Sequence, residues 1–320
     1  MKNRDFKKCL ITGITGSGGS FLTEHILKQN KKIKIYGLYR SNGYKKILEN
    51  KFKKRIQLFK LDLNKFNSVK KIIKKIKPDL IYNFASNADV RQSFEIPREI
   101  INNNYQSTLN IFEAVRLLKL KTLIVHISTS EVYGNVSKKD VPIKETLSMR
   151  PVSPYAVSKA YQDLCAQLYN KVFGLNIIIT RMFTYINPRR NNLFQSAFAT
   201  QILKMKNNKN NILKHGNLKS IRTSLSLEDA MSAYWLTAKK AKIGEIYNIG
   251  GTKKYLVGEV LDKLIRITKV KIKKKIDKKL LRKKDVTLQL PNINKFCSHT
   301  SWKQKDSLDV SLQRLLQELK

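Results

Sequence analysis

Residues Lys8-Cys-Leu-Ile-Thr-Gly-Ile-Thr-Gly-Ser-Gly-Gly-Ser-Phe-Leu22 decide the fold of this chain. An apolar run leads into three spaced glycines, and an apolar pattern at helical spacing follows them. This order predicts a strand, a tight turn and a helix, in which free backbone N–H groups and the positive end of a helix dipole can face a phosphate. Gly13, Gly16 and Gly19 are therefore candidates for binding a dinucleotide, although glycines at such a turn also serve close packing.

The composition is that of a globular protein. At 320 residues, of which 42% are hydrophobic, the chain can form one large domain or a domain with a smaller lobe. No stretch approaches the roughly 20 apolar residues of a membrane helix, and the first strand comes too early for a signal peptide, so we expect a cytoplasmic protein. Cys9, Cys165 and Cys297 are far apart, which predicts neither a disulfide framework nor a metal site.

The formal net charge of +41 is the unusual feature of the composition. A basic chain can bind nucleic acid or an acidic membrane. Here, however, the lysines alternate with isoleucines and asparagines along the whole chain, as in 70–75 and 271–284, and no nucleic-acid motif accompanies them. We interpret them as solvated surface, with attraction of an anionic substrate as the alternative.

Strand and helix patterns alternate after the first helix. Apolar runs predict strands at 33–38, 56–63, 80–85 and 122–127, and amphipathic stretches predict helices at 69–76 and 103–118. This alternation is typical of an α/β doubly wound parallel sheet of the Rossmann type, whose functional loops lie at the carboxyl ends of the strands.

The residue after the second strand bears on the choice of cofactor. In an NAD site an acidic residue normally binds the ribose hydroxyls there, but this chain has Arg40. A guanidinium with neighbouring hydroxyls suits a ribose 2′-phosphate, so the sequence favours NADP over NAD; an ordinary exposed arginine is the alternative. Asp62 and Leu63, at the end of the third strand, are further candidates for binding the cofactor.

Two later stretches carry groups that could perform chemistry. The fifth strand ends in Ser128-Thr-Ser-Glu-Val-Tyr-Gly134, which brings hydroxyls and a carboxylate to the functional edge of the sheet. Further on, Ser153-Pro-Tyr-Ala-Val-Ser-Lys159 places Tyr155 and Lys159 on one helix face. A lysine cation near a tyrosine hydroxyl lowers the pKa of the phenol and makes it a usable acid or base. In isolation such a pair is common on helix surfaces.

In order and spacing, these motifs resemble an extended short-chain dehydrogenase/reductase of the NAD-dependent epimerase/dehydratase family, which acts on nucleotide sugars. The G-x-x-G-x-x-G spacing of 12–22 is typical of that family. Within it the sequence most resembles the GDP-mannose 4,6-dehydratases. The resemblance runs nearly end to end and includes Asn187-Pro-Arg-Arg190, Gly216-Asn-Leu-Lys-Ser-Ile-Arg222 and Asp285-Val-Thr-Leu-Gln-Leu290.

The resemblance implies a specific chemistry. Tyr155, assisted by Lys159, removes the proton of the hexose 4-hydroxyl while hydride passes to NADP. Glu131 then acts as the base at C5 and helps to expel the C6 hydroxyl as water, and hydride returns to C6. Thr129 hydrogen-bonds the C4 oxygen and Ser130 positions the sugar. A solvated loop position is the alternative for Glu131.

The resemblance also implies substrate contacts. Arginines suit the pyrophosphate and ribose of the nucleotide. The candidates are Asn87, Arg189, Arg190, Arg222 and Arg282; for each arginine a surface charge is the alternative. Asn104 matches a family asparagine, or is a helix cap.

The sequence departs from the family pattern at several places. Asn87, Ala88 and Asp89 stand where these dehydratases more often carry Gln, Ser and His, and Ala88 has no hydroxyl for a phosphate. Asn191 replaces a glycine, and the loop after Arg40 is short, which bears on oligomer contacts.

We expect an NADP-binding Rossmann domain at 1–180 and a nucleotide-sugar lobe at 181–320, with about 220–250 returning to the first domain. A homodimer or homotetramer is expected, through helices near 103–118 and 155–173. The alternative functions are a UDP-glucuronate decarboxylase, another epimerase or reductase of the family, and a basic nucleic-acid-binding Rossmann protein.

Overall fold

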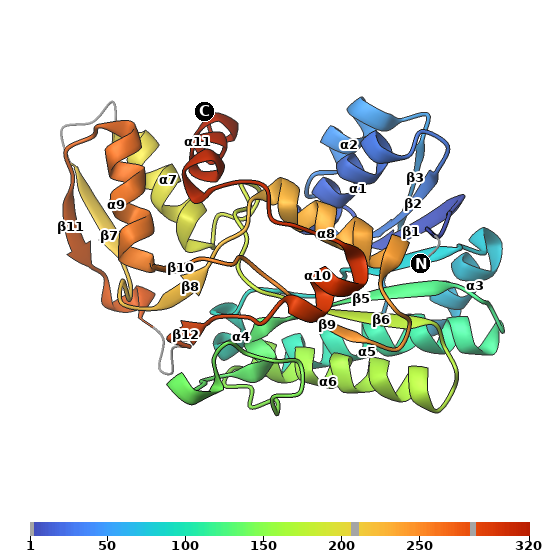
Figure 1. The fold of residues 1–320 in the computed structure, drawn as a ribbon. Helices are drawn as coiled ribbons and strands as arrows, with labels where there is room; N and C mark the ends of the chain where they lie inside the picture. The colour runs from blue at the N-terminus through green and yellow to red at the C-terminus, as the bar shows by residue number, and fades with distance from the viewer. Residues whose placement is uncertain (1–2, 206–210, 282–285) are drawn as a thin grey trace.

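A computed structural model describes residues 3–205, 211–281 and 286–320 (Figure 1). Its centre is a seven-stranded parallel sheet in the order β3-β2-β1-β4-β5-β6-β9. In chain order the strands are β1 (Lys8–Thr12), β2 (Lys34–Tyr39), β3 (Ile56–Lys60), β4 (Leu80–Asn83), β5 (Leu123–Thr129), β6 (Ile177–Met182) and β9 (Ile246–Ile249). The strand order reverses between β1 and β4, which confirms the predicted doubly wound fold.

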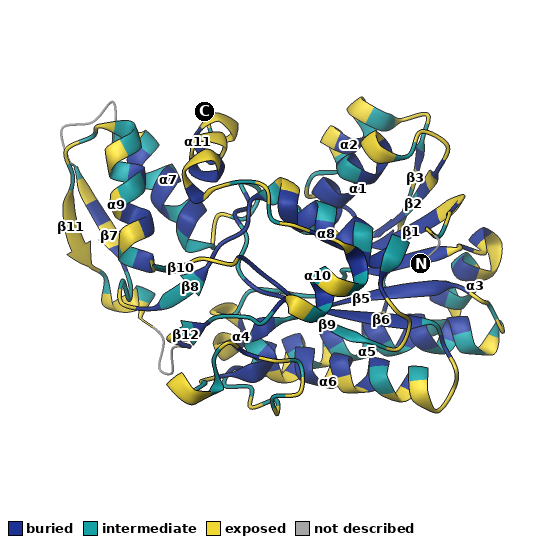
Figure 2. Cartoon of the chain, viewed as in Figure 1, coloured by how far each residue is buried: buried dark blue, intermediate teal, exposed yellow. Residues whose placement is uncertain are grey.

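Helices cover both faces of this sheet, as Figure 1 shows. One face carries α1 (Ser17–Gln29), α2 (Lys45–Phe52), α8 (Leu227–Lys240) and α10 (Asn294–Thr300), and the other carries α3 (Phe66–Ile76), α5 (Pro97–Leu117) and α6 (Pro154–Lys171). Every residue of β4 and β6 is consequently buried (Figure 2). Burial on both faces explains why the central strands are largely continuous apolar runs.

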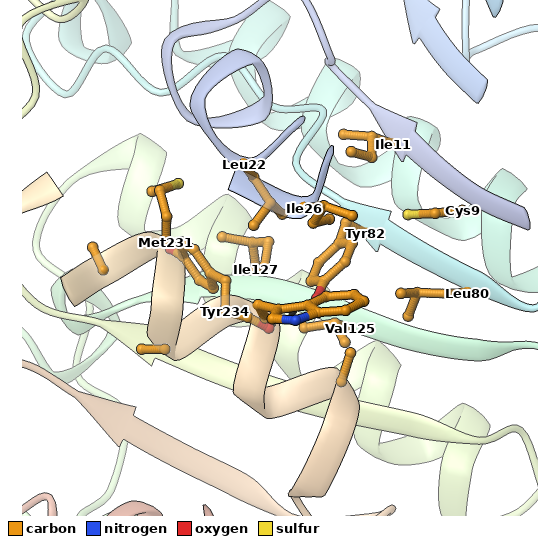
Figure 3. Close-up of a cluster of buried hydrophobic side chains, with 14 of the residues drawn as sticks. Cys9, Ile11, Leu22, Ile26, Leu80, Tyr82, Val125, Ile127, Met231 and Tyr234 are labelled. Carbon is orange, nitrogen blue, oxygen red and sulfur yellow. Dashed lines mark hydrogen bonds between the residues drawn. The ribbon is translucent and has the colours of Figure 1, made fainter. Parts of the chain in front are cut away.

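Aromatic residues close the core between the sheet and α8. Tyr82 of β4 and Tyr234 of α8 both lie in this cluster (Figure 3). The hydroxyl of Tyr82 donates to the backbone oxygen of Tyr234 at 2.9 Å, and the Phe84 and Tyr234 rings meet edge to face with centroids 5.3 Å apart. A buried phenol needs a partner, so this bond fixes α8 against the sheet.

Most of the rest of the chain forms a smaller lobe beside the sheet, at the left of Figure 1. It has its own apolar core, formed mainly by α7, α9 and α11. Its elements are α7 (Phe194–Met205), β7 (Ile212–His215), β8 (Ile221–Thr223), β10 (Lys254–Leu256), α9 (Val257–Thr268), β11 (Lys273–Ile276), β12 (Leu288–Gln289) and α11 (Leu308–Glu318). Strands β10, β8 and β12 form one small sheet and β11 pairs with β7. The described residues also form the short helices α4 (Gln92–Glu95), η1 (Ser130–Tyr133), η2 (Lys138–Asp140) and η3 (Lys278–Leu280).

The structure differs from the sequence expectations most clearly in three places. The fifth helix begins at Pro97, well before 103, because proline is favoured in the first turn of a helix. Strand β3 ends at Lys60, so Asp62 and Leu63 follow the strand. The segment after Arg40 contains α2, a helix that the sequence expectations lacked. Among the described helices, none has the length and apolar character needed to span a membrane.

Candidate active site

A pocket of about 760 Å³ lies at the carboxyl edge of the central sheet. It is lined by the segments that follow β1 to β6 and by the first turns of α6. This is where ligands bind in doubly wound folds, because the strand order reverses there. The predicted site residues that line it are Gly13, Gly16, Gly19, Arg40, Asp62, Leu63, Asn87, Thr129, Ser130, Glu131, Tyr155, Lys159 and Arg190.

The glycine turn forms one wall of the pocket. Gly13 has φ +65°, and a Cβ on Gly19 would lie 2.6 Å from the backbone oxygen of Gly13, so both positions require glycine. Helix α1 begins after Gly16, which offers no side-chain cap. The first backbone N–H groups of α1 are therefore free of side-chain partners and can bind a phosphate. The glycines thus serve close packing and also leave this helix end open.

Arg40 lies at the outer end of the same pocket. Its side chain is exposed, and its Nη1 donates to Oδ1 of Asn103 on α5 at 2.8 Å. Nearby, the backbone oxygen of Leu63 accepts from Asn110 Nδ2 at 2.8 Å, and Asp62 Oδ1 accepts from the backbone N–H of residue 64 at 3.0 Å. These bonds fix the chain between β3 and α3 and leave the Arg40 guanidinium with further donors for an anion.

The hydroxyl and carboxylate groups come from the end of β5 and from α6. Thr129 ends β5, and its Oγ1 accepts from the backbone N–H of Glu131 at 3.3 Å, which starts the short helix η1. Helix α6 begins at Pro154, where the Ser153 Oγ accepts from a backbone N–H and caps the helix. These two local structures place Tyr155, on α6, beside Thr129 and Glu131.

Burial controls the protonation of the two α6 residues. It raises the pKa of Tyr155, an effect that the positive charge of Arg190 opposes and the carboxylate of Glu131 reinforces. Burial also lowers the pKa of Lys159 to about 7, against the attraction of Asp163. Lys159 Nζ donates to the backbone oxygen of Ile127 at 2.6 Å. The sequence predicted a lowered pKa for Tyr155; in this structure desolvation of the phenol outweighs the positive charge of Arg190, and the pKa is raised.

Asn87 and Arg190 both line the pocket, on segments that contact each other. The backbone N–H of Asn87 donates to Oδ1 of Asn104 at 2.7 Å, and Arg190 Nη2 donates to the backbone oxygen of Ala88 at 2.8 Å. Asn104 is fully buried within α5 and also donates to Ser158 Oγ at 2.9 Å. Asn104 is therefore not a helix cap, because α5 begins a full two turns earlier.

Two other predicted residues, Arg189 and Arg222, lie elsewhere. Arg189 is outside the pocket lining, and its guanidinium donates to Glu24 and Ser20 of α1. Arg222, on β8, is also outside the lining and donates to the backbone oxygens of residues 221 and 286. Arg282 falls outside the described residues.

The pocket contains residues that the sequence reasoning missed. Gln289 of β12 is buried, and its Nε2 is 3.5 Å from Oε1 of Glu131. Tyr185, Asn192 and Tyr234 also contribute to the lining. Gln289 stood inside a quoted motif, but nothing in its local pattern indicated contact with a residue so distant in sequence. No cluster of His, Cys, Asp or Glu suited to a metal ion occurs in the described segments.

Comparison with known proteins identifies similar chains. The family model described as GDP-mannose 4,6 dehydratase matches residues 10–315. The GDP-mannose 4,6-dehydratase of Yersinia enterocolitica is 32% identical over 241 residues, which cover 72% of this chain and 64% of that relative. The alignment therefore spans less than two thirds of that relative's own length.

Solved structures give the same fold. The UDP-glucuronic acid 4-epimerase of Bacillus cereus, in complex with UDP-glucuronic acid and NAD, has a TM-score of 0.86 and 26% identity, with 98% of each chain covered. The protein RMD of Pseudomonas aeruginosa, complexed with NADPH, has a TM-score of 0.83 and 22% identity, again with 98% of each chain covered.

Proposed function

This chain belongs to the GDP-mannose 4,6-dehydratase family of enzymes, as its motifs predicted, and from that premise we propose that it converts GDP-mannose to GDP-4-keto-6-deoxymannose with NADP. The observation that carries the proposal is the composition of a single pocket. Thr129, Glu131, Tyr155 and Lys159 line it together with the glycine turn. An acid/base tyrosine, a second carboxylate base and a phosphate-binding helix end are the groups that this dehydration requires.

We propose that the glycine turn and Arg40 hold NADP, which when bound supplies a nicotinamide that accepts and returns hydride. The uncapped end of α1 suits the pyrophosphate, because its first N–H groups lack side-chain partners. The exposed guanidinium of Arg40 suits the 2′-phosphate. Asp62 and Leu63 also line the pocket, and we propose that they contact the adenosine part of the cofactor.

Tyr155 is the proposed base for the hydroxyl at C4 of the hexose. Because burial raises its pKa, it needs nearby positive charge to give up its own proton. Arg190 provides one such charge, and Lys159, one helical turn further along α6, is the proposed second. Thr129 is proposed to hydrogen-bond the C4 oxygen, since its hydroxyl interacts with the hydroxyl of Tyr155.

Glu131 is the proposed base for the elimination. Once C4 is a ketone, the hydrogen at C5 becomes acidic, and the carboxylate of Glu131 removes it as a proton. The electron pair left at C5 forms the C5–C6 double bond, the C6 hydroxyl leaves, and the proton carried by Glu131 converts it to water. Hydride returned to C6 and a proton delivered to C5 then saturate the double bond, and this proton balances the one that Tyr155 took from the C4 hydroxyl. Ser130, buried beside Glu131, is proposed to position the sugar.

Asn87 and Arg190 are the proposed contacts for the substrate. Arg190 lines the pocket and keeps guanidinium donors beyond the one bonded to Ala88, which suits it to phosphate oxygens. We leave Arg189 and Arg222 out of this site, because their guanidinium groups are bonded to other parts of the chain.

We further propose that a second copy of the chain covers α6. Val157, Tyr161, Leu164 and Leu168 follow each other at helical spacing and are 38% to 55% exposed. Such a stripe on a helix is more apolar than a surface helix face normally is, and pairing with the same stripe of a partner would bury it.

The test is incubation of purified protein with GDP-mannose and NADP, followed by mass spectrometry. We expect a product lighter by one water and no net change in cofactor redox state. Unchanged GDP-mannose, with turnover of no other GDP-sugar, would overturn the assignment.

A second candidate substrate is UDP-glucuronate, because the B. cereus structure that resembles this chain holds UDP-glucuronic acid. Release of carbon dioxide from that compound would indicate a decarboxylase, and a change of configuration without loss of mass would indicate an epimerase. Salt-dependent binding of duplex DNA without turnover of any nucleotide sugar would favour a nucleic-acid-binding role for the basic surface.

A further inference from the structure

We propose that Arg189 is a positioning residue that holds three walls of the cofactor pocket together. Its side chain joins α1 to the 187–193 loop, which carries Arg190, and to the 41–44 loop, which follows Arg40. This inference rests on the proposed binding of NADP, because it concerns the geometry of that site.

The first set of contacts fixes Arg189 to α1. Its guanidinium forms an ion pair with Glu24, and its Nη1 donates to Ser20 Oγ at 2.9 Å. Its Cζ also lies 3.7 Å from the centre of the Phe21 ring. A planar guanidinium can make these bonds and stack on a ring at the same time, which a lysine cannot. All three partners lie within the first eight residues of α1, the end that follows the glycine turn.

The second set fixes the 41–44 loop. The Tyr44 ring lies 5.0 Å from the Arg189 guanidinium, and the Tyr44 hydroxyl donates to the backbone oxygen of Arg189 at 3.0 Å. The backbone N–H of Tyr44 donates to the backbone oxygen of Thr15 at 2.8 Å, and Thr15 Oγ1 donates to the backbone oxygen of Ser41 at 2.8 Å. The glycine turn, the 41–44 loop and Arg189 thus form one connected unit.

The position of Arg190 follows from this anchor. Asn187 Oδ1 accepts from the backbone N–H of Arg189 at 2.9 Å, and the backbone oxygen of Asn187 accepts from the backbone N–H of Arg190 at 3.0 Å. This tight turn directs the two neighbouring arginines apart, so Arg189 packs on α1 while Arg190 enters the pocket. Release of Arg189 would therefore let Arg190 move away from Tyr155 and from the proposed position of the substrate phosphates.

Charge balance supports a specific role for the ion pair. The Glu24 carboxylate is 12% exposed and also accepts from Lys51 of α2 at 3.1 Å. With Arg189 and Lys51 both present, the Glu24 carboxylate joins α1, α2 and the 187–193 loop. Replacement of Arg189 leaves Lys51 attached, so the two helices stay joined while the loop loses its side-chain bonds to α1.

The test compares Arg189→Lys with Arg55→Lys. Arg55 is a matched control because its Nη1 and Nη2 bind the backbone oxygens of Leu27 and Asn30, at the other end of α1. For each protein, fluorescence titration gives the dissociation constant of NADPH, and thermal unfolding gives the midpoint temperature. Steady-state kinetics with GDP-mannose give the KM for NADP and kcat.

We expect Arg189→Lys to raise the NADPH dissociation constant and the KM for NADP about tenfold, as for loss of one charge-assisted hydrogen bond. Its kcat at saturating cofactor should change less than its KM. Arg55→Lys should lower the unfolding midpoint without changing NADPH affinity. Tyr44→Phe, which removes only the hydroxyl, should weaken NADPH binding about threefold.

Two results would overturn the proposal separately from the function. If the wild type binds NADPH and both Arg189→Lys and Tyr44→Phe bind it equally well, Arg189 has no positioning role. If Arg55→Lys loses NADPH affinity to the same extent, the effect is general loss of stability. A wild-type protein that binds no NADPH would instead refute the proposed cofactor, and this inference with it.

Discussion

Arg181 and Asp163 form a buried ion pair, joined by two hydrogen bonds, directly behind the candidate active site. Arg181 Nε and Nη2 donate to the two carboxylate oxygens of Asp163 at 2.8 and 3.0 Å, and Ser128 Oγ donates to the same carboxylate at 2.9 Å. Arg181 Nη1 also reaches the hydroxyl of Tyr133 at 2.9 Å. The pair therefore joins α6, β6 and the end of β5, the three elements that carry the candidate catalytic groups or support them.

Asp163→Ala should destabilise the protein strongly. The change leaves the Arg181 guanidinium buried without its carboxylate, and breaking a buried pair from one side costs about 3–5 kcal/mol. Urea denaturation gives the free energy of unfolding. Glu49→Ala, which breaks the exposed pair of Lys45 and Glu49 on α2, is the control and should cost less than about 1 kcal/mol. A similar loss of free energy of unfolding in the two variants would show that the buried pair contributes no more to stability than the exposed one.

Glu131→Gln and Tyr155→Phe should separate the two halves of the proposed reaction. Glu131→Gln removes the C5 base but leaves Tyr155, so NADPH should form with GDP-mannose in a single turnover while no water is lost. Tyr155→Phe should abolish both steps, with a loss of about 10²–10⁴-fold for an acid/base group. Absorbance of NADPH and mass spectrometry of the sugar measure the steps independently. Loss of both steps in Glu131→Gln would exclude it as the C5 base.

Lys159 should make stability depend on pH in a definite direction. Burial lowers its folded pKa to about 7 from 10.5, so between these values the unfolded chain binds the proton that the folded chain has lost. Lys159 thus opposes folding most strongly below about pH 7, and its unfavourable contribution fades as the pH rises toward 10.5.

The variant Lys159→Met removes this titration while keeping a long apolar stem. Its gain in free energy of unfolding over the wild type should be larger at about pH 7 than at about pH 9. Urea denaturation at both pH values measures this difference. Lys253→Met, at an exposed lysine, is the control and should show no such trend. If the gain in free energy of unfolding is the same at both pH values, the pKa of Lys159 is not lowered in the folded chain.

Arg40 should determine the preference between NADPH and NADH. Removal of its guanidinium in Arg40→Ala should weaken NADPH binding by about 1.5–3 kcal/mol, the value of hydrogen bonds to a charged group, and leave NADH binding nearly unchanged. Asn103→Ala should have a smaller effect, because Asn103 orients Arg40 through their 2.8 Å bond but carries no charge itself. Fluorescence titrations measure the dissociation constants of NADPH and NADH and hence their ratio. Arg98→Ala, at an exposed position of α5, is the control for the loss of one positive charge. Equal weakening of both nucleotides would place Arg40 away from the 2′-phosphate.

The sequence predicted the parts of this structure that depend on local pattern. Apolar runs without alternation identified the central strands, and the four-residue spacing of Tyr155 and Lys159 placed both on α6. Long-range contacts left no such pattern. Arg189 and Arg190 are adjacent in an irregular loop, so nothing in the sequence showed that one would pack on α1 and the other enter the pocket. Gln289 reaches Glu131 from β12, a contact that only the folded chain creates.

The stripe on α6 should control self-association. Leu164 and Leu168 are 55% and 49% exposed, and burying a leucine is worth about 1.5–3 kcal/mol. Leu164→Asp and Leu168→Asp would each bring a charge into the paired surface, which costs more than the lost apolar contact. We expect a dimer or larger assembly for the wild type and a monomer for the double variant, measured by light scattering after size-exclusion chromatography.

Ile276→Asp is the matched control for the α6 variants, because Ile276 is 62% exposed on β11, away from α6. It should leave the assembly unchanged. Thermal unfolding of each variant verifies that the chain still folds, since a substitution at an already exposed position removes little buried surface. A wild-type monomer, or an assembly that persists in the Leu164→Asp and Leu168→Asp double variant, would show that another surface, or none, mediates association.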